Sequence, residues 1–110
     1  MAVIDLDPAT EHSRDLVGPI MRSGELADAI IDAVAEDNPN TDVLVVDRDS
    51  YIRIHTLGRC RLTRASLEKY LGRPFPLADL EIEMPSWKGH VKTHVDEFIF
   101  YYPGYEQEQS

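Results

Sequence analysis

Apolar residues recur every three or four positions in the stretch that follows Ser23, which is typical of an amphipathic helix. The apolar set and the acids opposite to it are Leu26, Ala27, Ile30, Ala33 and Val34 against Asp28, Asp32 and Glu36. We expect Ser23 to cap this helix and Asn38-Pro39-Asn40 to end it. Before it, Val17–Met21 is a short apolar stretch that contains Gly18 and Pro19. It predicts an edge strand, where a missing N–H is tolerated.

A β-hairpin is predicted after the helix. Val43–Val46 and Tyr51–Leu57 are rich in β-branched and aromatic residues, and the turn-forming segment Asp47-Arg48-Asp49-Ser50 lies between them. Side chains alternate along the second strand, so that two sets face opposite ways: Tyr51, Arg53 and His55 on one side, and Ile52, Ile54 and Thr56 on the other.

The second half of the chain repeats these signals in another order. Cys60–Leu62 predicts a brief strand, and Thr63 is expected to cap a helix over Arg64–Leu71 that Gly72 ends. Alternation of Leu80, Ile82 and Met84 with Glu81 and Glu83 predicts a half-buried strand. We expect a loop over Pro85–Gly89. His90–His94 and Phe98–Tyr102 predict a second hairpin.

The order of these elements predicts an α+β fold for the 110 residues. Two small βαββ-like halves, about residues 17–57 and 58–102, are expected to share one core, because neither is large enough to fold alone. Antiparallel hairpins would pack with the two main helices. We expect residues 1–16 to form a flexible N-terminal tail and residues 103–110 a C-terminal tail.

The formal net charge of −9 is unevenly distributed. Residues 1–50 hold 12 acids and 3 bases, whereas residues 51–110 hold 8 of each. Six of the bases lie between Arg53 and Arg73, with Glu68 as the only acid among them. This pattern fits either an ordinary solvated surface or a charge dipole that orients the chain on a partner. Nucleic acid is disfavoured as a partner because phosphate binding calls for a net basic face.

The sequence predicts a cytoplasmic protein. No apolar run approaches the roughly 20 residues of a membrane span, and Met1–Thr10 lacks the pattern of a signal peptide. A single cysteine, Cys60, cannot form an internal disulfide, which fits a reducing compartment.

No catalytic residue, cofactor site or metal site is predicted. Cys60 is expected to be a small core residue, although a thiol enzyme that uses Cys60 with His55 is an alternative. His90 and His94 on one strand would lie about 13 Å apart, too far to share a metal ion. Glu81 and Glu83 fit a solvated strand face better than an acid–base pair. The phosphate-binding and nucleophile motifs of common enzymes are absent from the sequence.

Trp87, the only tryptophan, stands out as a binding residue. It lies in the predicted loop, and tryptophan is enriched at the energetic centres of protein interfaces. A place in the core is the competing interpretation.

An ordered series of short motifs resembles a known family. It comprises Val17-Gly18-Pro19-Ile20-Met21-Arg22, Asp37-Asn38-Pro39, Val43 and Val45 before Asp47-Arg48, Tyr51-x-Arg53-Ile54, Leu62-Thr63-Arg64, Ser66-Leu67-Glu68, Leu71-Gly72-Arg73-Pro74-Phe75, Leu80-Glu81-Ile82, Ser86 and Gly89. Over about residues 17–102 the chain resembles the coupling (effector) proteins of soluble di-iron multicomponent monooxygenases, the MmoB/DmpM family. The branch that serves toluene, xylene and alkene oxidation is the most similar.

The resemblance implies a cofactor-free, non-enzymatic protein that binds a di-iron hydroxylase. It would tune the active site, oxygen activation, coupling and regiospecificity of that partner, and it is expected to be monomeric when free. Candidate interface residues are Met84, Pro85, Ser86, Trp87, Lys88 and Gly89, with Asn38 and Arg53. In the methane-oxidising branch the matching loop holds small hydroxyl residues, from which Pro85 and Trp87 depart. The alternative function is a small-molecule-sensing α+β regulatory domain, which would need a concave apolar pocket.

Overall fold

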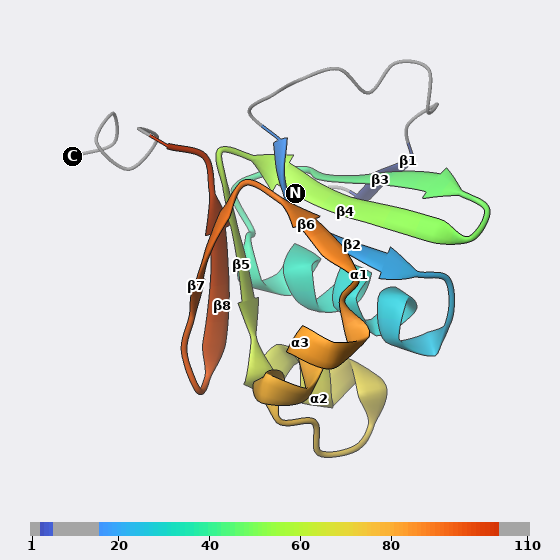
Figure 1. Cartoon of the computed structure of the whole chain (residues 1–110), viewed down its shortest axis with the longest axis vertical. Helices are drawn as coiled ribbons and strands as arrows, with labels where there is room; N and C mark the ends of the chain where they lie inside the picture. Colours follow the sequence, from blue (N-terminus) through green and yellow to red (C-terminus); the bar gives the residue numbers. More distant parts are fainter. Residues whose placement is uncertain (1–2, 6–15, 104–110) are drawn as a thin grey trace.

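A five-stranded and a three-stranded sheet pack against the helices in the computed structural model, which describes residues 3–5 and 16–103 (Figure 1). The larger sheet has the order β1 (Val3–Asp5), β3 (Val43–Arg48), β4 (Tyr51–Leu57), β2 (Leu16–Arg22) and β6 (Ser86–Lys88). The smaller sheet has the order β5 (Arg59–Thr63), β8 (Glu97–Tyr101) and β7 (His90–Thr93). The helices are α1 (Glu25–Asp37), α2 (Arg64–Leu71), the 3-10 helix η2 (Leu77–Asp79) and α3 (Leu80–Glu83). This architecture confirms the predicted α+β class.

The two hairpins and α2 were predicted correctly. β3 pairs with β4, and β7 pairs with β8, both antiparallel. The Thr63 hydroxyl accepts a hydrogen bond from the Ser66 N–H at 3.2 Å, and Gly72 ends α2 in the left-handed conformation. Along β4, Ile52, Ile54 and Thr56 are buried as expected, but His55 on the opposite side is buried as well.

β2 is an interior strand, so the prediction of an edge strand was wrong. It pairs with β4 on one side and with β6 on the other. Pro19 is tolerated because the pairing with β4 is interrupted at Gly18 and Pro19 and resumes at Ile20. The interruption coincides with a close approach, since a Cβ atom on Gly18 would lie 2.2 Å from the carbonyl oxygen of Ile54.

Ser23 does not cap α1, contrary to expectation. The N-cap position belongs to Gly24, which has no side chain to offer. The Ser23 hydroxyl instead donates to the carbonyl oxygen of Asp49 at 2.6 Å, and its N–H donates to that of Ser50. Ser23 therefore ties the start of α1 to the β3–β4 turn. Asn38 ends the helix as predicted.

The segment after α2 differs most from the prediction. Leu80–Met84 was expected to be a strand and forms α3 with its C-cap, because Leu77, Leu80 and Met84 are three and four residues apart and share one buried helical face. The expected loop at Pro85–Gly89 contains β6, which pairs with β2.

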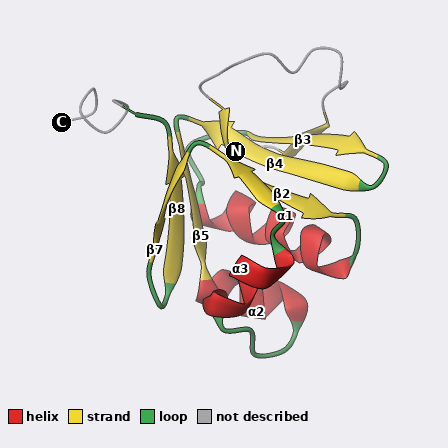
Figure 2. Cartoon of the chain, in the orientation of Figure 1, coloured by secondary structure: helices red, strands yellow, loops and turns green. Residues whose placement is uncertain are grey.

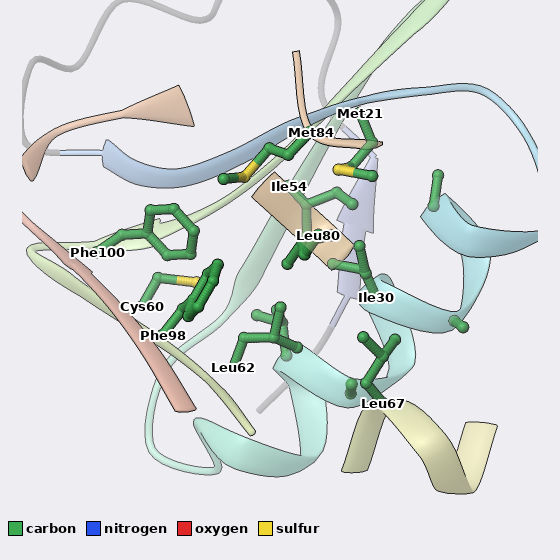
Figure 3. Packing of buried hydrophobic residues seen from close by; sticks show 14 of the residues in the cluster. Met21, Ile30, Ile54, Cys60, Leu62, Leu67, Leu80, Met84, Phe98 and Phe100 are labelled. Atoms are coloured by element: carbon green, nitrogen blue, oxygen red, sulfur yellow. The ribbon is translucent and has the colours of Figure 1, made fainter. Parts of the chain in front are cut away.

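Both halves of the chain contribute to one core. Met21, Ile30 and Ile54 from the first half meet Leu80, Phe98 and Phe100 from the second in a single buried cluster, and Cys60 lies within it (Figure 3). The prediction that Cys60 is a core residue is confirmed. Figure 2 shows the helices gathered on one side of the β3–β4–β2–β6 sheet, with the β5–β8–β7 sheet beside them.

The N-terminal region differs from the tail expected over residues 1–16. Val3–Asp5 forms β1, which pairs in parallel with β3, and Leu16 is buried at the start of β2. Residues 6–15, and residues 104–110 of the expected C-terminal tail, lie outside the described residues. In the described part of the chain, no helix is long and apolar enough to cross a membrane.

Candidate partner-binding surface

The expected interface segment lies at an open edge of the larger sheet. β6 is the last strand in the order, so only one of its edges is paired within the described sheet. Its register with β2 places Ser86 opposite Ile20, Trp87 opposite Pro19 and Lys88 opposite Gly18. Because side chains alternate along a strand, Trp87 lies on one face of the sheet and Ser86 and Lys88 lie on the other.

Two large apolar side chains are exposed along this segment. Trp87 is 43% exposed, and Ile82, five residues earlier in α3, is 80% exposed. The sequence interpretation missed Ile82 because a strand would have turned it inward together with Leu80 and Met84. In a helix, Leu80 and Met84 share the buried face, and Ile82 lies on the opposite face. A large apolar side chain on the surface costs hydration free energy that contact with a partner would recover.

Met84 and Gly89 hold the ends of the segment. Met84 is buried in the core cluster (Figure 3). Gly89 has φ +94°, and a Cβ atom there would lie 2.6 Å from Val17 Cγ1 and 2.7 Å from the carbonyl oxygen of Tyr101. The segment is therefore fixed at both ends, and between them it displays Pro85, Ser86 and Trp87.

Asn38 lies apart from this segment and faces the interior. Its Nδ2 donates to the carbonyl oxygens of Val34 at 2.8 Å and Arg61 at 2.7 Å. Its Oδ1 accepts from the N–H of Arg61 at 2.9 Å. The side chain thus joins the end of α1 to β5, and we leave it out of the surface proposed below.

Arg53 lies on the face of the sheet opposite to Trp87. It is the partner of Ile20 in β2 and of Val46 in β3, and Ile20 is in turn the partner of Ser86. One cross-strand row therefore connects Arg53 to β6. Among the expected interface residues, the structure brings Arg53 together with Ser86 and Lys88 on this face and leaves Trp87 at the edge.

The chemistry of Cys60 argues against a thiol enzyme. Burial raises the pKa of the Cys60 thiol to about 12, which keeps it protonated and unreactive near neutral pH. The basic residues near it in sequence do not offset the loss of hydration. In the described ranges, no group of three or more histidine, cysteine or acidic side chains is placed to hold a metal ion.

One hollow of about 890 Å³ lies between β5, the start of α2 and the β7–β8 turn. Four of its charged side chains form two pairs, in which Arg61 Nε donates to Glu97 Oε1 at 2.6 Å and Arg64 Nε donates to Glu68 Oε2 at 2.8 Å. The bond from Arg61 holds the pKa of Glu97 below its ordinary value. Paired charges line much of this hollow, so it does not resemble the mostly apolar pocket that a sensing domain would need.

Comparisons with known proteins identify one family. The model of the MmoB/DmpM family matches residues 15–101. The chain is 54% identical over 92 residues to the alkene monooxygenase effector subunit of Xanthobacter autotrophicus Py2, a match that spans 84% of this chain and 91% of that one.

Two solved structures are similar to this chain. A chain in a structure of the phenol hydroxylase–regulatory protein complex matches with a TM-score of 0.66 and 28% identity, over 79% of this chain and 98% of that chain. Regulatory protein B of soluble methane monooxygenase matches with a TM-score of 0.61 over 82% of this chain and 67% of that chain. Its 22% identity supports likeness of fold alone.

Proposed function

Because the chain belongs to the MmoB/DmpM family and is a regulatory component of a monooxygenase, not its catalytic subunit, we propose that it docks on the di-iron hydroxylase through Ile82–Gly89. The matched phenol hydroxylase structure is a complex of a hydroxylase with its regulatory protein. The observation that carries the proposal is the exposure of Trp87 and Ile82 on a segment that Met84 and Gly89 fix in place.

Fixed ends matter energetically. A segment that is already ordered loses little conformational entropy when it binds, so more of the contact free energy appears as affinity. Trp87 offers a large, rigid apolar surface of the kind found at the centres of interfaces.

Regulation by docking requires a difference in affinity. A bound protein changes the hydroxylase only to the extent that it binds one conformation better than another. We propose that this preference tunes oxygen activation, coupling to electron delivery and regiospecificity in an alkene- or aromatic-oxidising system. The free chain would be a cytoplasmic monomer, and the hydrocarbon would be selected in the partner.

The test is the substitution Trp87→Ala, alone and combined with Ile82→Ala. We expect Trp87→Ala to weaken binding to the hydroxylase by about 2 kcal/mol, since it removes a candidate interface anchor. NADH-driven product yield should fall at limiting effector and recover when more effector is added. Calorimetric titration and product analysis measure the two quantities.

Val95→Ala is the matched control. Val95 is 77% exposed, but it lies in the β7–β8 turn, away from β6. This variant should bind and couple as the unchanged protein does. Equal affinity and product yield for Trp87→Ala and the unchanged protein would remove Ile82–Gly89 from the interface.

A further inference from the structure

Basic residues gather on the face of the larger sheet that points away from the helices. Alternation along β4 turns Ile52, Ile54 and Thr56 toward the core, so Tyr51 and Arg53 lie on the outer face. Figure 2 shows α1 on the opposite side of this sheet. Cross-strand partners share a face, which extends the assignment to the neighbouring strands.

The register defines three rows on this outer face. The first row is Arg22, Tyr51 and Arg48; the second is Ser86, Ile20, Arg53 and Val46; and the third contains Lys88 with Gly18, and His55 with Leu44. Four of these positions carry an Arg or a Lys, and none of these described positions carries an acid. Arg22, Arg48 and Tyr51 are exposed, and Arg53 and Lys88 are partly exposed, whereas Val46 and His55 on the same face are buried.

This face stands out in a chain of formal net charge −9. α1, on the other side, carries five acids and no base. Interactions within the chain also involve Arg48, Arg53 and Lys88. The proposal therefore depends on the sign and the spacing of the charges that this face presents to a partner. The described residues thus place a cationic sheet face opposite a helix that is rich in acids, two of which, Glu25 and Glu36, are paired with Arg73 and Lys69.

We propose that this outer face is a cationic docking surface for an acidic surface of the hydroxylase. The inference rests on the proposed function and adds a second contact region to it. β6 links the two regions, because Ser86 and Lys88 belong to the outer face while Trp87 lies at the edge. Neighbouring strands lie about 5 Å apart and alternate residues about 7 Å apart, so the complementary carboxylates would be spaced by roughly 7–10 Å.

The charge distribution favours a protein over a nucleic acid as the occupant. A polyanion extends far beyond the face and would be repelled by a chain whose net charge is −9. A folded partner with a local acidic patch can match the face and avoid that repulsion. Such a pairing acts mainly on the rate of association and weakens as salt screens it.

The test uses the double variant Arg22→Glu with Arg48→Glu, and Arg53→Glu alone. Arg22 and Arg48 lie at strand ends and are exposed, so charge reversal should leave the fold intact. We expect the association rate constant with the hydroxylase to fall about ten-fold at about 0.05 M salt and less than about two-fold at about 0.5 M salt. Arg53→Glu should show a smaller decrease with the same salt dependence. Stopped-flow kinetics measures the rates, and circular dichroism checks the fold.

The control is Arg59→Glu with Arg73→Glu, which changes the net charge equally but lies on β5 and after α2. It also removes the exposed ion pair of Arg73 with Glu25, which contributes little to stability. It should slow association less than about two-fold at either salt concentration. If the double variant is unfolded, Arg22→Gln with Arg48→Gln replaces it and should give the same salt dependence at lower amplitude. An effect equal to that of the control, or one independent of salt, overturns the proposal.

Other outcomes separate this inference from the proposed function. If Trp87→Ala weakens binding and the charge variants do not, the edge is the interface and the cationic face is not. If the unchanged protein fails to bind the hydroxylase, both proposals fall. Binding of labelled duplex DNA that is lost in the charge variants, with hydroxylase association unaffected, would replace the protein partner with a nucleic acid.

Discussion

Gly18 and Gly24 have nearly the same φ, +143° and +146°. Their surroundings differ. A Cβ atom on Gly24 would have no neighbour within 4 Å, whereas one on Gly18 would lie 2.2 Å from the carbonyl oxygen of Ile54. The pair therefore separates the cost of an unfavourable φ from the cost of a steric clash between β2 and β4.

Gly24→Ala is expected to lower the free energy of unfolding by about 1–3 kcal/mol, the cost of a side chain in this region of φ. Gly18→Ala should lower it by a further 1–3 kcal/mol or so, because the strands must also move apart. Urea unfolding of both variants measures the difference. Equal losses would show that β2 and β4 separate without cost at Gly18.

At the scale of the element, α2 is held at both ends by acids. The carboxylate of Asp37 accepts from the Thr63 N–H at 2.7 Å and from the Ser66 hydroxyl at 2.6 Å. Glu68 Oε2 accepts from Arg64 Nε at 2.8 Å and from the Phe75 N–H at 2.7 Å. The bond from the Phe75 N–H ties the connector after α2 back to the helix.

Stability should depend on pH through Glu68. The hydrogen bonds from Arg64 and from the Phe75 backbone hold the pKa of Glu68 below its ordinary value of 4.5. The ionised form is therefore favoured by folding, so its stabilisation is present above about pH 4.5 and is lost as the pH falls through the lower folded pKa.

Glu68→Gln should accordingly be less stable than the unchanged protein at neutral pH, and the gap should narrow below about pH 4.5. Thermal unfolding across this range measures the gap. Glu81→Gln, at an exposed position of α3, is the control and should leave the pH profile as it is. A gap that stays constant with pH would mean that Glu68 acts by packing alone.

Elements with local signals were predictable from the sequence, and those that depend on distant partners were not. Thr63 and Gly72 mark the two ends of α2 within the segment itself. The residues from Leu80 to Met84 fit both strand alternation and helical spacing, and only the packing of Leu77 and Leu80 decides between them. β6 becomes a strand because it pairs with β2, far earlier in the chain.

The candidate site, like the fold, could be predicted from the sequence only where the signal is local. The lone Trp87 was identifiable from the sequence as a possible anchor, and the structure places it half exposed at a sheet edge. Ile82 was missed because its orientation follows from α3, which was assigned as a strand. Asn38 was predicted as an interface residue because of the family motif that contains it. No pattern in the neighbouring sequence predicts its hydrogen bonds to Arg61, 23 residues later.

At the scale of the whole molecule, the two halves complete each other. β6 from the second half adds an edge strand to the sheet of the first half. Phe98 and Phe100 pack in the same cluster as Ile30 and Ile54 (Figure 3). Burial of apolar surface is the main stabilising contribution to folding, and each half alone would leave much of its core in water.

We expect a fragment of residues 1–57 to be unfolded by circular dichroism and amide NMR dispersion, and a fragment of residues 58–110 likewise. Mixing the two should restore native-like spectra if they reassemble around the shared core. A folded 1–57 fragment would show that β2 holds its place without β6.

Trp87 is the only tryptophan of the chain and it is half exposed at the end of the sheet. A fluorinated tryptophan incorporated during expression would therefore give a single fluorine resonance, while an unlabelled partner stays silent. The line width and chemical shift of that one signal would report whether the labelled position of the indole ring loses its water when the complex forms.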